Sequence, residues 1–228
     1  QDGANMGAYG VGCEYNFYQC IIWTEGDNGN TKIYDFDTDL WQGISSPGNA
    51  NGDYIDMVYD IESDRIIWLK GDNGTAKAYD YYSNNWEIIS SPGDGNGDGI
   101  GMAYDIESDR VVLVKGNNGT VKTYDYNNNT WENMGNTIGS NGDDIAIAYD
   151  IESDRVLLSN GNGSFHSYDY NNDTWEELTS PGDANGDYLA MAYHILADRV
   201  IWVKGDNGST KAYDYNTDSW EILESPGS

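Results

Sequence analysis

Oxygen-bearing side chains recur in the chain at a spacing that could bind a hard cation. Residues 49–53, 94–98 and 183–187 alternate such residues around a glycine, and residues 140–144 form a weaker copy. The alternating residues are Asn49, Asn51, Asp53, Asp94, Asn96, Asp98, Asp183, Asn185 and Asp187. Calcium prefers oxygen ligands in glycine-containing loops. The loops therefore predict a calcium site, which would need further ligands from elsewhere, and ordinary Asx-type turns are the alternative.

Six asparagines stand in the Asn-x-Ser/Thr pattern that accepts an N-linked glycan in secreted proteins. They are Asn73, Asn118, Asn128, Asn162, Asn172 and Asn207. Four of them precede Gly-Thr or Gly-Ser, where Asn-Gly also favours a tight hairpin turn. The pattern predicts surface turns in either case, and glycosylation if the source is eukaryotic.

Catalytic chemistry usually needs a residue that stands out among repeats, and few residues do so here. The two histidines, His166 and His194, occupy different strands of different repeats, and no nucleophile elbow, histidine cluster or phosphate loop occurs. Repeated tryptophans could form the stacking platforms of a multivalent lectin.

These candidates recur because the chain repeats itself about every 45 residues. Tryptophans mark the period at Trp41, Trp86, Trp131, Trp175 and Trp220, each preceded by a Tyr-Asp pair. The five repeats cover residues 1–48, 49–93, 94–138, 139–182 and 183–228. Because they run end to end, we interpret the chain as a single domain.

Each repeat predicts four short strands, termed a to d, joined by tight turns. In the second repeat we expect strand a at 54–59, strand b at 65–70, strand c at 75–79 and strand d from residue 86. The apolar centre of strand b predicts burial on both faces. One such sheet cannot cover its own faces, whereas five arranged radially can. We predict an all-β, five-bladed β-propeller of four-stranded antiparallel blades, closed as a ring.

The repeat resembles the kelch family of β-propellers. The likeness lies in an apolar strand b ending in glycine, then Tyr79-Asp80 in strand c, then Trp86 in strand d, and it covers essentially the whole chain. The kelch Gly-Gly doublet is replaced by Gly71-Asp72 and its equivalents. The resemblance implies that the strand-d tryptophans fill gaps between blades.

Charge, apolar runs and cysteines indicate where the protein is located and which classes of partner it could bind. The chain has 228 residues and a formal net charge of -28, which would repel nucleic acid and anionic membranes. The longest apolar runs are too short to span a bilayer. Cys13 and Cys20 flank a predicted hairpin turn, which indicates a disulfide in an extracellular chain, with two buried thiols as the alternative. A start at Gln1 suits a secreted protein whose leader has been removed.

Together these features predict a non-catalytic, extracellular structural or adhesive module, N-glycosylated and part of a larger assembly. Its partners would be proteins, including further copies of itself, or glycans. A multivalent, calcium-dependent lectin is the first alternative, because near-identical blades would offer several equivalent pockets. A secreted propeller enzyme is the second. No cofactor other than calcium is indicated.

Overall fold

The computed structural model describes most of the chain and gives it an all-β fold. The described residues are 8–15, 18–25, 29–48, 54–71, 73–93, 99–137, 144–182, 188–205 and 208–225, with side chains described from residue 20 onward. These residues fall into two compact units, one comprising 1–97 and 125–131 and the other 98–124 and 132–228. None of the described residues forms a helix able to span a membrane.

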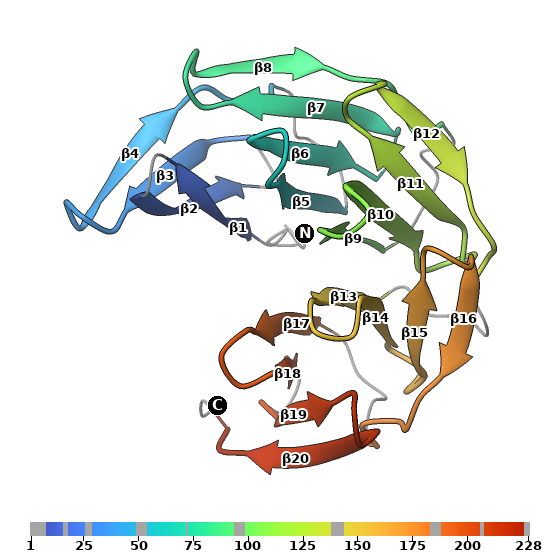
Figure 1. The fold of residues 1–228 in the computed structure, drawn as a ribbon. Helices are drawn as coiled ribbons and strands as arrows, with labels where there is room; N and C mark the ends of the chain where they lie inside the picture. Colours follow the sequence, from blue (N-terminus) through green and yellow to red (C-terminus); the bar gives the residue numbers. More distant parts are fainter. Residues whose placement is uncertain are drawn as a thin grey trace, which may run out of the picture. The chain divides into compact units, whose positions relative to one another are not determined.

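The strands form five four-stranded antiparallel sheets, each in chain order, and these are the blades of a propeller (Figure 1). The first blade contains β1 (Ala8–Tyr15), β2 (Tyr18–Glu25), β3 (Thr31–Asp35) and β4 (Leu40–Ile44). The second contains β5 (Ile55–Asp60), β6 (Arg65–Lys70), β7 (Thr75–Asp80) and β8 (Asn85–Ile88). The third contains β9 (Ile100–Asp105), β10 (Arg110–Lys115), β11 (Val121–Asp125) and β12 (Thr130–Asn133).

The fourth blade contains β13 (Ile145–Asp150), β14 (Arg155–Asn160), β15 (Phe165–Asp169) and β16 (Thr174–Glu177). The fifth contains β17 (Leu189–His194), β18 (Arg199–Lys204), β19 (Thr210–Asp214) and β20 (Ser219–Leu223). The predicted fold of five four-stranded antiparallel blades is confirmed. In the second blade, strand b has the predicted bounds, and the other strands differ from them by one residue at one end or both.

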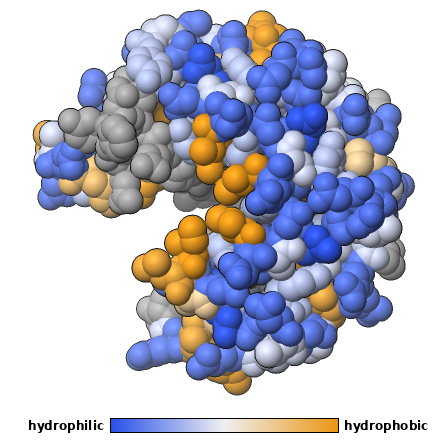
Figure 2. Space-filling model, viewed as in Figure 1, coloured by the Kyte–Doolittle hydropathy of each residue, from blue (hydrophilic) through white to orange (hydrophobic). Residues whose placement is uncertain are grey.

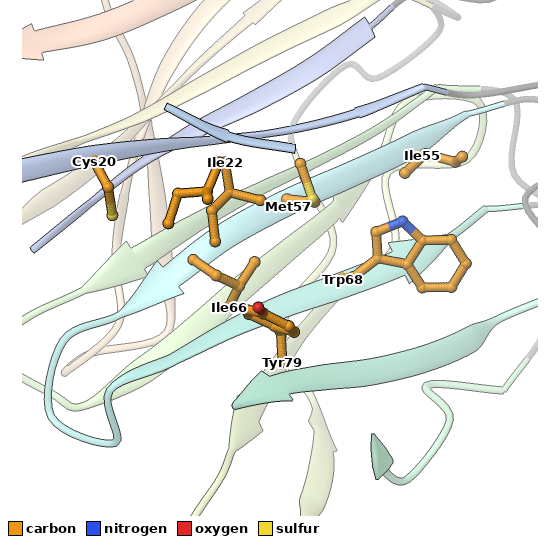
Figure 3. Close-up of a cluster of buried hydrophobic side chains, with 8 residues drawn as sticks. Cys20, Ile22, Ile55, Met57, Ile66, Trp68 and Tyr79 are labelled. Atoms are coloured by element: carbon orange, nitrogen blue, oxygen red, sulfur yellow. The ribbon is translucent and has the colours of Figure 1, made fainter. Parts of the chain in front are cut away.

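Packed side chains between neighbouring blades form the cores of both units. In the first unit, residues from β2 and β3 meet residues from β5, β6 and β7, including Ile22, Met57 and Trp68 (Figure 3). In the second unit, one cluster joins the third and fourth blades and another joins the fourth and fifth. Strand b is buried along almost its whole length in β6, β10 and β14, as predicted. Each large side chain buried in this way contributes about 1.5–3 kcal/mol.

Strand order places the loops on two opposite rims. Because successive strands are antiparallel, the a–b and c–d turns lie at one end of each blade, called here the a–b rim. The b–c turns lie at the other end, the b–c rim, together with the segments that leave strand d. Ser91 and Ser180 show this, since their hydroxyls donate to the carbonyls of Gly74 and Gly163 in b–c turns, both at 2.7 Å.

Asx residues with positive φ end the four-residue turns after strands a and c. Their φ values lie between 47° and 56°, a left-handed region that Asn and Asp tolerate better than most residues. In most of these turns a strand tyrosine donates its hydroxyl to the Asx side chain, as Tyr59 does to Asp64 at 2.8 Å. The Asx residues are Asp39, Asp64, Asn84, Asp109, Asn129, Asp154, Asp173, Asp198 and Asp218.

A second contact of the c–d Asx residue holds the preceding blade. Asn84 Oδ1 accepts the Ser45 N–H at 2.8 Å, while Trp86 Nε1 donates to the Ser45 carbonyl at 2.8 Å. We call this pair of bonds the inter-blade clasp. Three further clasps hold Ser90, Gly135 and Thr179 through Trp131, Trp175 and Trp220. These four tryptophans thus lie between blades, as the kelch resemblance implies, and each also carries a hydrogen bond between blades.

Replacing Trp86 with phenylalanine should lower the free energy of unfolding by about 1–2 kcal/mol, because the Ser45 carbonyl loses its donor. Denaturant unfolding measures the loss. Trp41→Phe is a matched control. The ring centroids of Trp41 and Tyr34 lie 5.2 Å apart, and those of Trp86 and Tyr79 lie 5.0 Å apart. However, Trp41 is 51% exposed and its indole makes no hydrogen bond to a described residue. Equal losses in the two variants would contradict the clasp.

Candidate functional site

The acceptor asparagines on the b–c rim are exposed at turn tips. Asn73, Asn118 and Asn162 each accept, through Oδ1, the backbone N–H two residues further on, at 2.9 Å. This bond is the Asx-turn chemistry that was the alternative interpretation, and an exposed Asx turn is also open to a glycan. Asn207 lies outside the described residues. Glycosylation at these positions stays a prediction.

Two further acceptor asparagines stabilise c–d turns. Asn128 and Asn172 are exposed, and each donates through Nδ2 to the aspartate three residues before it. The distances are 2.6 Å to Asp125 Oδ2 and 2.7 Å to Asp169 Oδ2. Because a glycan would be attached to this same nitrogen, these two positions differ chemically from those on the b–c rim.

The predicted calcium loops belong to the segments between strands d and a. All nine predicted ligands, from Asn49 to Asp187, lie outside the described residues. Within the described part of the chain, no three His, Cys, Asp or Glu side chains gather in a way that could hold a metal ion. The calcium site therefore remains a prediction.

Cys20 is disulfide-bonded and buried. The only other cysteine of the chain is Cys13, and its backbone lies directly opposite Cys20 in the β1–β2 pair. Directly opposite residues of antiparallel strands lie about 4.5–5.5 Å apart, a Cα separation that suits a disulfide. We propose the pairing of Cys13 with Cys20 on this geometry.

The two histidines lie in different surroundings. His166, in β15, is 3% exposed, and burial lowers its pKa although the charge of Glu177 acts in the opposite direction. His194 is exposed at the end of β17, where its Nδ1 accepts the Ala197 N–H at 3.1 Å. That bond replaces the one made by Asp60, Asp105 and Asp150 in the a–b turns of the second, third and fourth blades. The second histidine thus has a structural role in its turn.

Exposed apolar side chains on the a–b rim were not predicted from the sequence. In the second unit, Ile106, Ile151, Ile195 and Leu196 follow strand a of their blades and are exposed by 39%, 37%, 66% and 92%. We call these four residues the apolar turn row. Strands β9, β13 and β17 are neighbours, so their turns are neighbours too. Figure 2 shows apolar side chains gathered within a largely hydrophilic surface. The signal in the sequence was the isoleucine in Asp-Ile-Glu-Ser-Asp, an unusual residue for a turn.

Polar groups beneath the apolar turn row link consecutive turns. Tyr149 donates its hydroxyl to Asp154 at 2.8 Å and also interacts with Asp105 of the preceding blade. Asp105 and Asp150 are each 2% exposed. Burial raises the pKa of both carboxyls above the usual value, even though hydrogen bonds from Ser108 and Ser153 oppose the change. These carboxylates stabilise the turns and are hidden from solvent.

Comparisons with known proteins support the fold but do not assign the chain to a family. No protein-family model and no curated protein matches the chain. The chain has the fold of a propeller seen in very distant structures. A Nidogen/Laminin complex structure has a TM-score of 0.72 at 8% identity over 95% of this chain and 79% of that one. TolB from Acinetobacter baumannii has a TM-score of 0.61 at 16% identity over 87% and 50%.

An auxiliary nutrient binding protein from Bacteroides thetaiotaomicron has a TM-score of 0.68 at 12% identity, over 92% of this chain and 55% of that one. The chain therefore spans about half the length of the last two proteins. At these identities the likeness concerns the fold alone. The five-bladed propeller is shown, whereas the kelch resemblance stays a resemblance because no family model matches.

The change in stability caused by Asp105→Asn should be more favourable at pH 7 than at pH 4. A carboxyl whose pKa is raised on folding favours the folded state at low pH, and this contribution is lost as pH rises through the folded-state pKa. Asp80→Asn is the opposite control. Hydrogen bonds from Ser83 and the charge of Arg65 lower the pKa of Asp80 against the opposing effect of burial, so this variant should lose stability at pH 7. Thermal unfolding from pH 4 to pH 8 measures both, and parallel profiles would contradict the assignment.

Millimolar calcium should raise the thermal unfolding midpoint relative to a chelator if the predicted loops bind the ion, because a ligand that binds only the folded state stabilises it. Substituting Asp53, Asp98 and Asp187 with asparagine should abolish the rise. Magnesium at the same concentration controls for ionic strength. An unchanged midpoint would dismiss the site.

Proposed function

We propose that this propeller is a non-catalytic, extracellular interaction module that works as one unit of a larger assembly and contacts a protein through its a–b rim. The observation that carries the proposal is the apolar turn row. Turn tips are usually polar, and contiguous exposed apolar surface marks interaction sites. The row stands out further because the chain as a whole carries a formal net charge of -28.

The repeated polar residues support binding rather than catalysis, because they are used within the fold. The tyrosines hold turn Asx residues, the tryptophans hold neighbouring blades, and Arg155 and Arg199 pair with Asp169 and Asp214 at 3.0 and 2.8 Å. Four strand-d tryptophans place their indole N–H against a backbone carbonyl. Tryptophans held between blades in this way are poorly placed to act as the sugar-stacking platforms that the lectin alternative requires.

The chemistry of the partner follows from what surrounds the row. Ile106 and Ile151 are each followed by an exposed glutamate, Glu107 and Glu152. A complementary partner surface would therefore present apolar side chains flanked by lysine or arginine, since opposite charges favour docking and like charges suppress it. The acceptor asparagines of the b–c turns point to glycans on the opposite rim, so glycosylation there would leave the row accessible.

Secretion from a eukaryotic host followed by light scattering and intact mass spectrometry tests the proposal. We expect a mass above the 25.3 kDa of the bare chain that falls on deglycosylation, and a particle larger than the monomer. The double variant Ile151→Asp with Leu196→Asp should reduce the particle to the monomer, because burying an unpaired carboxylate at an interface costs several kcal/mol.

Ile222→Asp is the matched control, since Ile222 is 80% exposed but lies on β20 away from the a–b turns. It should leave the assembly intact. A native protein that runs as a monomer of bare mass would overturn both the assembly and the glycosylation. Specific hits on a glycan array with the monomer would favour the lectin instead.

A further inference from the structure

Within the described part of the chain, five buried polar atoms of the third and fourth blades have no hydrogen-bond partner. They are Thr123 Oγ1, Thr137 Oγ1, His166 Nδ1, and the Oδ1 and Nδ2 atoms of Asn160. The four residues are between 1% and 8% exposed. An unpaired buried hydroxyl or amide is destabilising, so native proteins rarely leave several together without a partner.

The strand registers direct three of these residues into the same junction. Thr123 pairs with Val112 and lies two residues from Val121, and both valines pack against Val156 and Leu158 of the fourth blade. His166 pairs with Leu158 across β14 and β15 and therefore faces the third blade. Asn160 lies two residues after Leu158 in β14 and shares that face.

Thr137 is placed at this junction by comparison with the equivalent positions of other repeats. At two other junctions a strand-c lysine crosses to the segment after the preceding strand d: Lys77 Nζ donates to the Pro47 carbonyl and Lys211 Nζ to the Pro181 carbonyl. At this junction His166 stands at the lysine position and Thr137 at the proline position. The long ammonium side chain that joins the two blades elsewhere is thus replaced by a shorter, neutral pair.

Two positions of the junction carry smaller side chains than in the second and fifth blades. Leu158 occupies the position held by Trp68 and Trp202, both of which are fully buried. Asn160 occupies the position of Lys70, Lys115 and Lys204, which are buried as well. A tryptophan and a lysine of those blades are therefore replaced by smaller side chains, and the asparagine brings a donor and an acceptor without formal charge.

We propose that this junction binds ordered water, held by Asn160, His166, Thr137 and Thr123. Water fits the chemistry because it both donates and accepts, and a buried water typically makes about three hydrogen bonds to polar groups that would otherwise lack a partner. A cation would meet no carboxylate among these four residues, and an anion would meet no lysine or arginine. The water replaces the lysine as the polar link between the two blades.

A crystal structure at a resolution that reveals ordered solvent tests the site directly. We expect density for water within hydrogen-bonding distance of at least two of the four side chains. A dry junction, direct bonds among the four side chains, or density for a larger molecule would each overturn the proposal.

The variant Thr137→Val gives a second test whose sign decides. If water binds Oγ1, removing the hydroxyl should lower the thermal midpoint by about 2–4 °C, as expected for the loss of one hydrogen bond in a chain of this size. If the junction is dry, the change removes an unpaired buried hydroxyl and the midpoint should rise, which would overturn the proposal. Thr123→Val repeats the test in a regular strand, and exposed Thr38→Val is the control.

Discussion

The bond from a strand tyrosine to a left-handed Asx residue is the interaction on which the rest of the fold depends. A four-residue turn between antiparallel strands needs positive φ at its last position, which costs most residues about 1 kcal/mol or more. Aspartate and asparagine tolerate it, and the tyrosine hydroxyl holds their side chains, as Tyr213 holds Asp218 at 2.7 Å. The same bond fixes the register of the hairpin and buries the tyrosine ring between blades, so local and tertiary structure support each other.

The inter-blade clasp connects this bond within one blade to the preceding blade. Asp218 Oδ1 accepts the tyrosine hydroxyl within its own blade and the Thr179 N–H from the preceding one, and Oδ2 accepts the Thr179 hydroxyl. Burial acts to raise the pKa of Asp218, but these hydrogen bonds together hold it below its usual value. One carboxylate thus sets a turn and a blade junction together. A blade that loses its turn would also lose its neighbour, which is why stability in such arrays depends on nearest-neighbour interfaces.

Sequence reasoning predicted the elements that repeat and missed those that depend on contacts between repeats. The period, the strand positions and the burial of strand b followed from apolar runs and Asn-Gly turns. The role of Asp64 and its equivalents did not, because Asp in a turn is common and its bond to Tyr59 appears only when the strands pair. The predicted calcium ligands fall outside the described residues, so that part of the candidate site still rests on residue spacing alone. The apolar turn row was overlooked because Ile106 and Ile151 lie in segments that otherwise have turn composition.

In a repeat protein, functional residues are expected at positions whose side chains are not needed for the fold, or at positions that differ from their equivalents in the other repeats. The tyrosines, arginines and tryptophans that recur are used within the blades, so their recurrence explains the fold. Ile106 and Ile151 recur as well, yet part of each side chain is exposed to solvent. His166 and Asn160 depart from the lysines of other blades and bring unpaired polar atoms into a buried junction. Ile106 and Ile151 therefore support binding of a partner protein at the surface, whereas His166 and Asn160 support binding of water in the interior. The two inferences rest on different residues and are physically independent.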